Sequence, residues 1–485
     1  MIRVYPRFCF CRHAIMVSRI EGDYVLTKEQ LEQLHARGLQ SKADFVEIFE
    51  EQTTSESISM LNDKVEEINN VGRAGVGIRL YSGIQSVYGY SNEMDMDSLF
   101  SLIDDLCQGI GCEDKKEECN LIQEEFEDRH PVKIDPIDAK LEDKISLLKR
   151  ANDMRLKEEK IVKIQTTLSS IRQYVQISNS DGKLIQDRRI RTRMACQAFG
   201  QQEEIMQSGF YGPGASMGLE FFEETTPEEI AKEAIRIALV MLEAKDCPSG
   251  KMPVIIDNGF GGVIFHEACG HALEATAVAK NQSVFSGKEG QQIASCCVTA
   301  IDDGTIPNAW GSQNVDDEGN FQQRRVLIEN GILKQYMIDR LNGRRMNVES
   351  SGSGRRQSYK FEPTSRMSNT YIEAGKDSFD SLFEGIEKGL YAKNMGGGSV
   401  NPQTGEFNFA VNEGYLIENG KISYPVKGAS LIGTGVEILM NIDKVSDNLK
   451  RGQGMCGSIS GSIPTDVGQP AIRVSSITVG GTAHE

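Results

Sequence analysis

Apolar and polar residues alternate along several stretches of the first half of the chain. Residues 76–80 alternate before a Ser-Gly pair and residues 87–90 resume the pattern, which predicts a β-hairpin. Longer strand-like runs at 161–178 and 184–198 flank an Asn-Ser-Asp-Gly turn sequence and predict a second hairpin. The first half is therefore expected to contain a sheet of neighbouring antiparallel strands.

Helical patterns lie between these strands. Residues 27–30 form a capping box before a short apolar stripe, and apolar residues recur at helical spacing over 141–148. The segment 226–229 combines an N-cap threonine, a proline in the first turn and a glutamate, which is a strong helix start. Residues 113–128 are acidic and lack a clear period, so we expect a surface linker there.

The amino-acid composition of the chain changes near residues 246–253, where two prolines and a glycine occur together. Beyond this point glycines are frequent, and Asn-Gly turns recur at 330–331 and 419–420. We therefore predict an α+β fold with two domains. An N-terminal mixed domain of hairpins and flanking helices spans 22–246, and a C-terminal, mostly antiparallel, curled or barrel-like sheet spans 247–485.

Length and composition agree with this division. The chain has 485 residues, more than the roughly 250–300 that a single hydrophobic core supports. No run of about 18 apolar residues occurs, so we expect no spanning helix and no membrane partner. Residues 1–21 are expected to be a disordered extension rather than a signal peptide, because Arg12 and His13 interrupt their apolar part.

The charge balance argues against nucleic-acid binding. The formal net charge is −17, and an acidic protein repels phosphate backbones unless it carries a local basic patch. The arginines within 188–193 and at 355–356 are the densest basic clusters, and we expect them on solvated faces of strands. The 11 cysteines have no framework of short spacings, which is typical of free thiols in a reducing compartment such as the cytoplasm.

Candidate chemistry centres on a histidine pair. The chain has six histidines, and His266 and His271 lie close together, with Glu267 directly after the first. Neutral imidazoles are zinc ligands, and a neighbouring carboxylate can accept a proton from a water at the metal. Two unrelated histidines remain the alternative interpretation at this point.

The spacing of this pair is unusual. Residues five apart in a regular α-helix point about 140° away from each other, so both imidazoles cannot face one ion. A π-bulge between Glu267 and His271 would restore the alignment, and Gly270 would tolerate the distortion. The other solution is that the helix ends near Gly270. We favour the bulge, because the residues after His271 still have helical character.

A third ligand is needed to complete a catalytic zinc site. Cys456 lies in the glycine-rich segment 452–457, where flanking glycines would let a thiolate approach a metal closely. A loop cysteine without a role is the alternative, and spacing does not decide between the two.

Several segments together resemble the TldD branch of the TldD/PmbA metallopeptidases. They are HEACGHALEATAVAKNQSVFSGKEG, DDGTIPNAWGS, SGSGRRQSYK, SRMSNTYIEAG, the MCG turn, VGQPAIRVSSITVGGT and, in the first half, VGRAGVGIRLYSG. The resemblance implies that His266 and His271 match the family's histidine ligands, Cys456 its cysteine ligand and Glu267 its catalytic glutamate. It also implies an ATP-independent cytoplasmic enzyme that uses zinc.

The resemblance further implies that flexible or unfolded peptides are cleaved in an enclosed cavity formed by dimerisation. The partner is then a second copy or a PmbA-like subunit. Arg355 and Arg356 are weak candidates for binding the substrate. Two other functions stay open: a cysteine peptidase that uses Cys456, and a non-catalytic regulatory scaffold.

Overall fold

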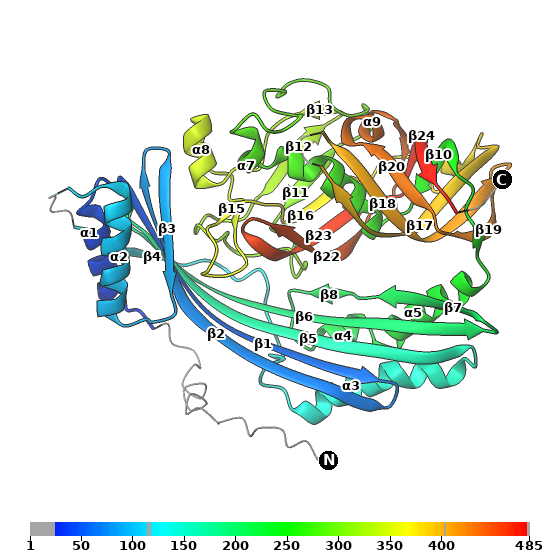
Figure 1. Cartoon of the computed structure of the whole chain (residues 1–485), viewed down its shortest axis with the longest axis horizontal. Helices are drawn as coiled ribbons and strands as arrows, with labels where there is room; N and C mark the ends of the chain where they lie inside the picture. The colour runs from blue at the N-terminus through cyan, green and yellow to red at the C-terminus, as the bar shows by residue number, and fades with distance from the viewer. Residues whose placement is uncertain (1–24, 114–117, 402–403, 483–485) are drawn as a thin grey trace, which may run out of the picture.

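The computed structural model describes residues 25–113, 118–401 and 404–482. The N-terminal half is built on a long curved sheet, which Figure 1 shows in blue to green. Its strands follow the order β3-β2-β1-β5-β6-β4, with β7 and β8 paired to β6. The strands are β1 Phe45–Leu61, β2 Lys64–Ser82, β3 Gln85–Ser91, β4 Ile122–Glu124, β5 Ile161–Asn179, β6 Lys183–Gln202, β7 Ile205–Tyr211 and β8 Gly214–Ala215.

Two groups of helices cover opposite ends of this sheet (Figure 1). Helices α1 (Lys28–Leu39) and α2 (Met96–Ile110) pack on one end of β1 and β2. Helices α3 (Leu141–Asn152) and α5 (Pro227–Leu242) pack on the other, beside the short helix α4 (Phe221–Glu224). The predicted capping boxes at α1 and α5 are both present.

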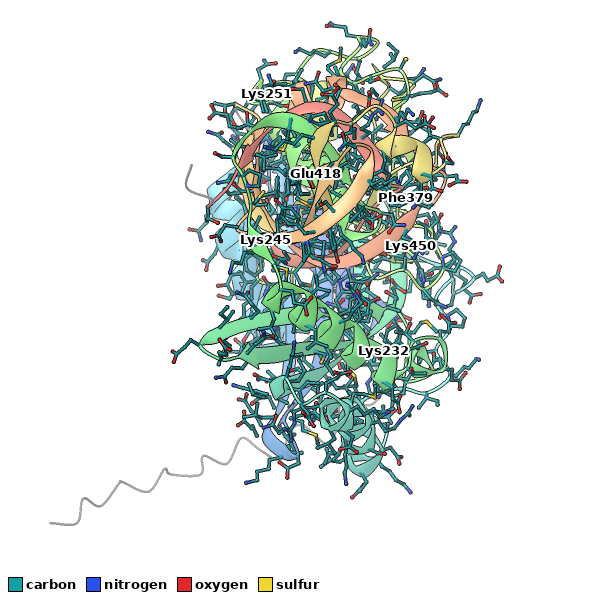
Figure 2. The ribbon with its side chains drawn as sticks, turned by 90° about the vertical axis from the view of Figure 1, so that its right-hand side faces the viewer. Lys232, Lys245, Lys251, Phe379, Glu418 and Lys450 are labelled. Atoms are coloured by element: carbon teal, nitrogen blue, oxygen red, sulfur yellow. The ribbon has the colours of Figure 1, made fainter. Side chains whose placement is uncertain are left out.

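The C-terminal half contains a closed ring of strands. The order β17-β10-β24-β20-β18 closes on itself because β17 also pairs with β18. In Figure 2 these strands curve around one axis above the helix that carries Lys232. The strands are β10 Gly250–Ile256, β17 Lys388–Val400, β18 Glu406–Glu418, β20 Ser430–Thr434 and β24 Ile472–Gly480, with β9 Lys245–Asp246, β19 Lys421–Lys427 and β21 Ile442–Val445 attached.

A second sheet packs beside this ring. Its order is β13-β12-β11-β16-β23-β22, which makes β22 an edge strand. The bounds are β11 Ala300–Asp303, β12 Arg324–Glu329, β13 Ile332–Leu333, β16 Asn369–Ile372, β22 Lys450–Ser458 and β23 Gly461–Gln469. Other elements of this half are α8 Arg340–Met346, α9 Gly435–Met440 and the pair β14 Gly354–Arg355 and β15 Thr364–Ser365. One hydrophobic core joins the ring and this sheet.

Buried ion pairs hold the two halves together. Arg79 on β2 donates from Nη2 to Glu47 at 2.8 Å and to Glu318 of the C-terminal half at 2.6 Å. Arg189 on β6 lies 2.6 Å from Asp317. All five side chains are almost fully buried. Removing one partner of such a pair typically costs about 3–5 kcal/mol, so the relative placement of the halves is strongly specified.

The prediction that the arginine clusters lie on solvated faces holds for Arg188, which is exposed, but was wrong for four of the other arginines. Arg189, Arg191, Arg355 and Arg356 are each at least 94% buried. Arg191 donates to the backbone carbonyls of the loop that contains Trp310, so the β6 cluster faces the C-terminal half. Alternation along a strand distinguishes its two faces, but it does not reveal that a second layer covers the polar one.

The predicted α+β fold class is confirmed, including the barrel-like ring in the C-terminal half. The linker expected over 113–128 is in part a strand, because β4 pairs in parallel with β6. The division into 22–246 and 247–485 stays a prediction, and the extension 1–21 lies outside the described residues. In the described part of the chain, no helix has the length and apolarity to cross a membrane.

Candidate metal centre

The two histidines lie on a short irregular helical segment inside the C-terminal core. A 3₁₀ turn at Phe260–Gly262 leads into α6 (Val263–Phe265), a π-helical turn at His266–Gly270 and a second 3₁₀ turn at His271–Leu273. Phe265, Cys269 and Leu273 along this segment are fully buried. Apolar packing on several sides therefore fixes the backbone that presents the histidines.

The predicted π-bulge is confirmed. The backbone N–H of His271 donates to the carbonyl of His266, five residues earlier. This register adds one residue to the turn, so the imidazole rings come within 5.1 Å of each other, centroid to centroid. The expectation that the helix continues was wrong, because Glu274 is extended with ψ 127° and a separate helix, α7 (Ala275–Val278), follows it.

Three predicted ligands meet in this region. Nε2 of His266 lies 3.3 Å from Sγ of Cys456, and Nε2 of His271 lies 3.4 Å from it. The three ligand atoms all lie within 4.8 Å of one another. His266 and Cys456 are buried, although 190 residues separate them in the chain. Two imidazoles and a thiolate at this spacing suit one tetrahedral zinc ion with a fourth position left for water.

The Nδ1 atom of each imidazole contacts a polar side chain, which holds the ring in place. Nδ1 of His271 lies 3.1 Å from Oε2 of Glu274, and Nδ1 of His266 lies 3.2 Å from the hydroxyl of Thr370 on β16. A carboxylate can only accept, so Nδ1 of His271 carries the proton. These contacts leave both Nε2 atoms directed at Cys456, the arrangement that metal-bound histidines commonly show.

Glu267 stands beside the three atoms without joining them. Its Oε2 lies 3.6 Å from Nε2 of His271, and its side chain is 25% exposed. Glu267 and His271 are four residues apart, a spacing that places both side chains on the same side of a helical turn. A carboxylate in this position has access to solvent and to a molecule held at the three ligand atoms.

The electrostatics favour a thiolate at Cys456. Burial opposes its ionisation, but the charge and hydrogen bond of His266, with those of His271, outweigh burial and lower the pKa of Cys456 to about 3. Burial likewise opposes a charge on His271, yet Glu274 and Cys456 raise its pKa well above the usual value. Without a metal, a thiolate therefore faces an imidazolium, and a cation would replace the proton.

The two arginines suggested for substrate binding are already engaged. Arg355 donates to the carbonyls of Met367 and Pro464. Arg356 donates to Glu47 at 2.6 Å. Both side chains are buried. Substrate binding by either arginine stays a prediction, and it would require that arginine to break one of these hydrogen bonds.

Sequence reasoning missed Glu274 and Thr370. Glu274 lies three residues after His271, a spacing that places two helical side chains on one face, so a signal was present. Thr370 lies 104 residues from His266. The packing of β16 against the histidine segment brings it close, and no local pattern reveals that packing.

Models of three domains of one family match the chain. They describe the PmbA/TldA metallopeptidase domain 1 over residues 46–109, the central domain over 134–242 and the C-terminal domain over 249–481. The chain belongs to the PmbA/TldD metallopeptidase family. The third domain contains the predicted metal ligands and the predicted catalytic glutamate. The predicted enzyme class, a metallopeptidase, is thus confirmed for this family member.

Relatives within the PmbA/TldD family extend over nearly the whole chain. A protein named Metalloprotease TldD homolog from Haemophilus influenzae is 38% identical over 453 residues, covering 90% of this chain and 93% of its own length. A Zinc metalloprotease TldD homolog from Saccharolobus solfataricus is 33% identical over 234 residues, covering 48% and 52%. The crystal structure of TldE from Thermococcus kodakarensis shares the fold, with a TM-score of 0.73 at 19% identity, covering 93% of this chain and all of that one.

Gly270 is required for space rather than for an unusual backbone conformation. Its φ and ψ of −53° and −52° are ordinary helical values, which corrects the expectation that glycine permits a distortion. A Cβ at this position would lie 2.3 Å from Sδ of the buried Met367. Either the buried Met367 side chain or the π turn must then shift to make room.

We therefore expect Gly270→Ala to weaken zinc binding although it removes no ligand. Overpacking of a buried site typically costs about 1–3 kcal/mol, so thermal unfolding should also occur at a lower temperature. Zinc titration with a competing chelator and calorimetry measure the two effects. The control is Gly72→Ala, where a Cβ meets nothing within 4 Å. Equal zinc affinity in Gly270→Ala and wild type would contradict this account.

Proposed function

We propose that the chain is an ATP-independent zinc metallopeptidase that acts on flexible peptides in the cytoplasm. The observation that carries this proposal is the convergence of His266, His271 and Cys456, with Glu267 beside them. Family membership supports the reaction class, and the name of the Saccharolobus relative supports the choice of metal.

The donor set fits zinc. Two neutral imidazoles and one thiolate give a borderline-soft site, which suits Zn²⁺ better than the oxygen ligands that Mg²⁺ or Ca²⁺ require. The Zn²⁺ would be held by His266, His271 and Cys456. When bound, it would polarise a substrate carbonyl and lower the pKa of the attacking water.

Glu267 acts as the general base in this proposal. Its carboxylate stands 3.6 Å from the Nε2 atom of His271 and accepts the proton of the water that attacks the peptide carbonyl. The same carboxylate then passes this proton to the departing amine. The partly exposed position of Glu267 leaves its carboxylate accessible to a water and to a bound peptide, as a general base requires.

Flexible peptides are the substrates that the surroundings favour. The hairpin of β22 and β23 carries Cys456, and beside it Met455 is 52% exposed and Ile459 is 73% exposed. Such apolar side chains suit the residues that unfolded chains expose. An extended peptide is held most economically through its backbone, which also explains tolerance of many sequences. The natural substrate is left open.

Assembly into a dimer would shield this site. A hydrolytic centre open to the cytosol would attack any accessible loop, so we propose an enclosed space between two subunits. The partner is a second copy or a PmbA-like subunit. TldE has the same fold, and a partner with the same fold supports a two-fold arrangement. A fully active monomer in solution would contradict this part of the proposal.

A cysteine peptidase is the second candidate. The Cys456 thiolate faces His271, whose Nδ1 contacts Glu274, and this resembles a nucleophile, base and orienting acid. The metal site remains preferable because the cysteine mechanism uses only one of the two converging histidines. A non-catalytic scaffold would need neither of them.

Removal of metal separates these functions. We expect 1,10-phenanthroline to abolish cleavage of an unstructured fluorogenic peptide and added Zn²⁺ to restore it. A cysteine peptidase would keep its activity in the chelator and lose it to iodoacetamide, and a scaffold would cleave nothing under either condition. Persistence of full activity in metal-free protein would overturn the zinc mechanism.

A further inference from the structure

Glu274 occupies a position that local helix chemistry does not explain. It is the N-cap residue of α7, a position where Ser, Thr, Asp and Asn are the usual capping residues. Here the side chain makes no capping bond. Instead its Oε2 lies 3.1 Å from Nδ1 of His271, and only 7% of the side chain is exposed. The carboxylate is thus buried against a histidine of the candidate metal centre.

Arg366 links this carboxylate to the cysteine. Its Nη2 donates to the backbone carbonyl of Cys456 at 2.5 Å. Its Nη1 donates to Ser460 and Gly461 in the turn of the same hairpin. Its Nε lies 3.9 Å from Oε1 of Glu274, and neither atom has a hydrogen-bond partner among the described residues. One buried guanidinium therefore contacts both segments that carry the candidate ligands.

We propose that Glu274 and Arg366 are positioning residues that fix the histidine segment and the cysteine hairpin relative to each other. This inference rests on the proposed metal centre. Glu274 keeps the proton of His271 on Nδ1 and so presents the Nε2 lone pair towards Cys456. Arg366, which lies beside Glu274, donates a hydrogen bond to the Cys456 carbonyl and so holds the cysteine hairpin in place. Together they define the separation of two ligands that are 185 residues apart in the chain.

The Nδ1 atoms of the two histidines contact partners of different charge. His271 contacts a carboxylate, whereas His266 contacts the hydroxyl of Thr370. An anionic acceptor raises the basicity of an imidazole more than a neutral one does, because it stabilises positive charge on the ring. Loss of Glu274 should therefore weaken zinc binding more than loss of the Thr370 hydroxyl.

The test measures metal binding rather than activity. Zn²⁺ affinity is determined by competition with a chromophoric chelator, and the absorption spectrum of Co²⁺-loaded protein reports the ligand geometry. Loss of a group that orients a ligand typically lowers metal affinity by about 10–100-fold. We expect this increase in Kd and an altered Co²⁺ spectrum for Glu274→Gln, Glu274→Ala and Arg366→Lys. Thr370→Val should show a smaller change.

The outcomes separate this inference from the proposed function. Wild-type protein that binds neither Zn²⁺ nor Co²⁺ would overturn both. If wild type binds one zinc and Glu274→Gln has the same Kd and Co²⁺ spectrum, only the positioning role fails. A lower melting temperature of the metal-free variant, with unchanged Kd and spectrum, would likewise show a purely structural role. Glu274→Gln keeps the shape of the side chain, so it serves if the other variants do not fold.

Discussion

Glu267→Gln is expected to retain one zinc per chain and to lose peptide hydrolysis by about 10²–10⁴-fold in kcat, the typical contribution of a general base. Glutamine has the same shape but cannot accept the proton of the attacking water. Because Glu267 is outside the group of three converging ligand atoms, its replacement should leave metal content unchanged. Steady-state cleavage of an unstructured fluorogenic peptide, together with metal analysis of the same sample, measures both quantities.

The matched control for this variant is Glu289→Gln. Glu289 is an exposed glutamate in the same half of the chain, and no chemistry is assigned to it. Its variant should cleave the peptide at the wild-type rate. A near-normal kcat in Glu267→Gln would show that Glu267 is not the general base and would favour the hypothesis that Cys456 is a nucleophile.

Cys456→Ala is expected to lose both zinc and activity. The thiolate supplies the one anionic ligand of the site, so its removal should cost more than the roughly 10–100-fold in affinity that follows loss of a group behind a ligand. Metal analysis after dialysis against a weak chelator should then find zinc far below one per chain. This measurement separates the two candidate enzymes, since a nucleophilic cysteine could be removed without any change in metal content.

Cys269→Ala provides the comparison. Cys269 is fully buried in the same π turn, but it belongs to the hydrophobic core and not to the converging group. Its replacement should therefore leave one zinc per chain. Full zinc content in Cys456→Ala, or loss of zinc in both variants alike, would contradict the assignment of Cys456 as a ligand.

The local geometry of the site was within reach of sequence reasoning. Five-residue spacing and the helical period together require an irregular turn between His266 and His271, and the structure has a π turn there. Capping signals likewise placed the starts of α1 and α5. These inferences succeed because each depends on a few neighbouring residues whose backbone geometry leaves little choice.

The residues that surround the candidate ligands could not be predicted from the sequence. Arg366 looks like one more arginine in a polar segment, yet it is fully buried and its contacts are 90 or more residues away in sequence. Closure of the ring depends on β10 pairing with both β17 and β24. Such pairings depend on the packing of the whole domain, and the alternation of apolar and polar residues within one strand does not indicate which strands pair with it.

The distance along the chain between the candidate ligands also sets the order of events during biosynthesis. His266 and His271 leave the ribosome well before Cys456, and joining them requires closure of a loop of about 190 residues. In the proposed site the histidine pair alone lacks the third ligand, so the complete ligand set would form only once β22 and β23 have folded against β16. A partly synthesised or truncated chain would therefore be inert, and the growing polypeptide and its neighbours would be spared from cleavage.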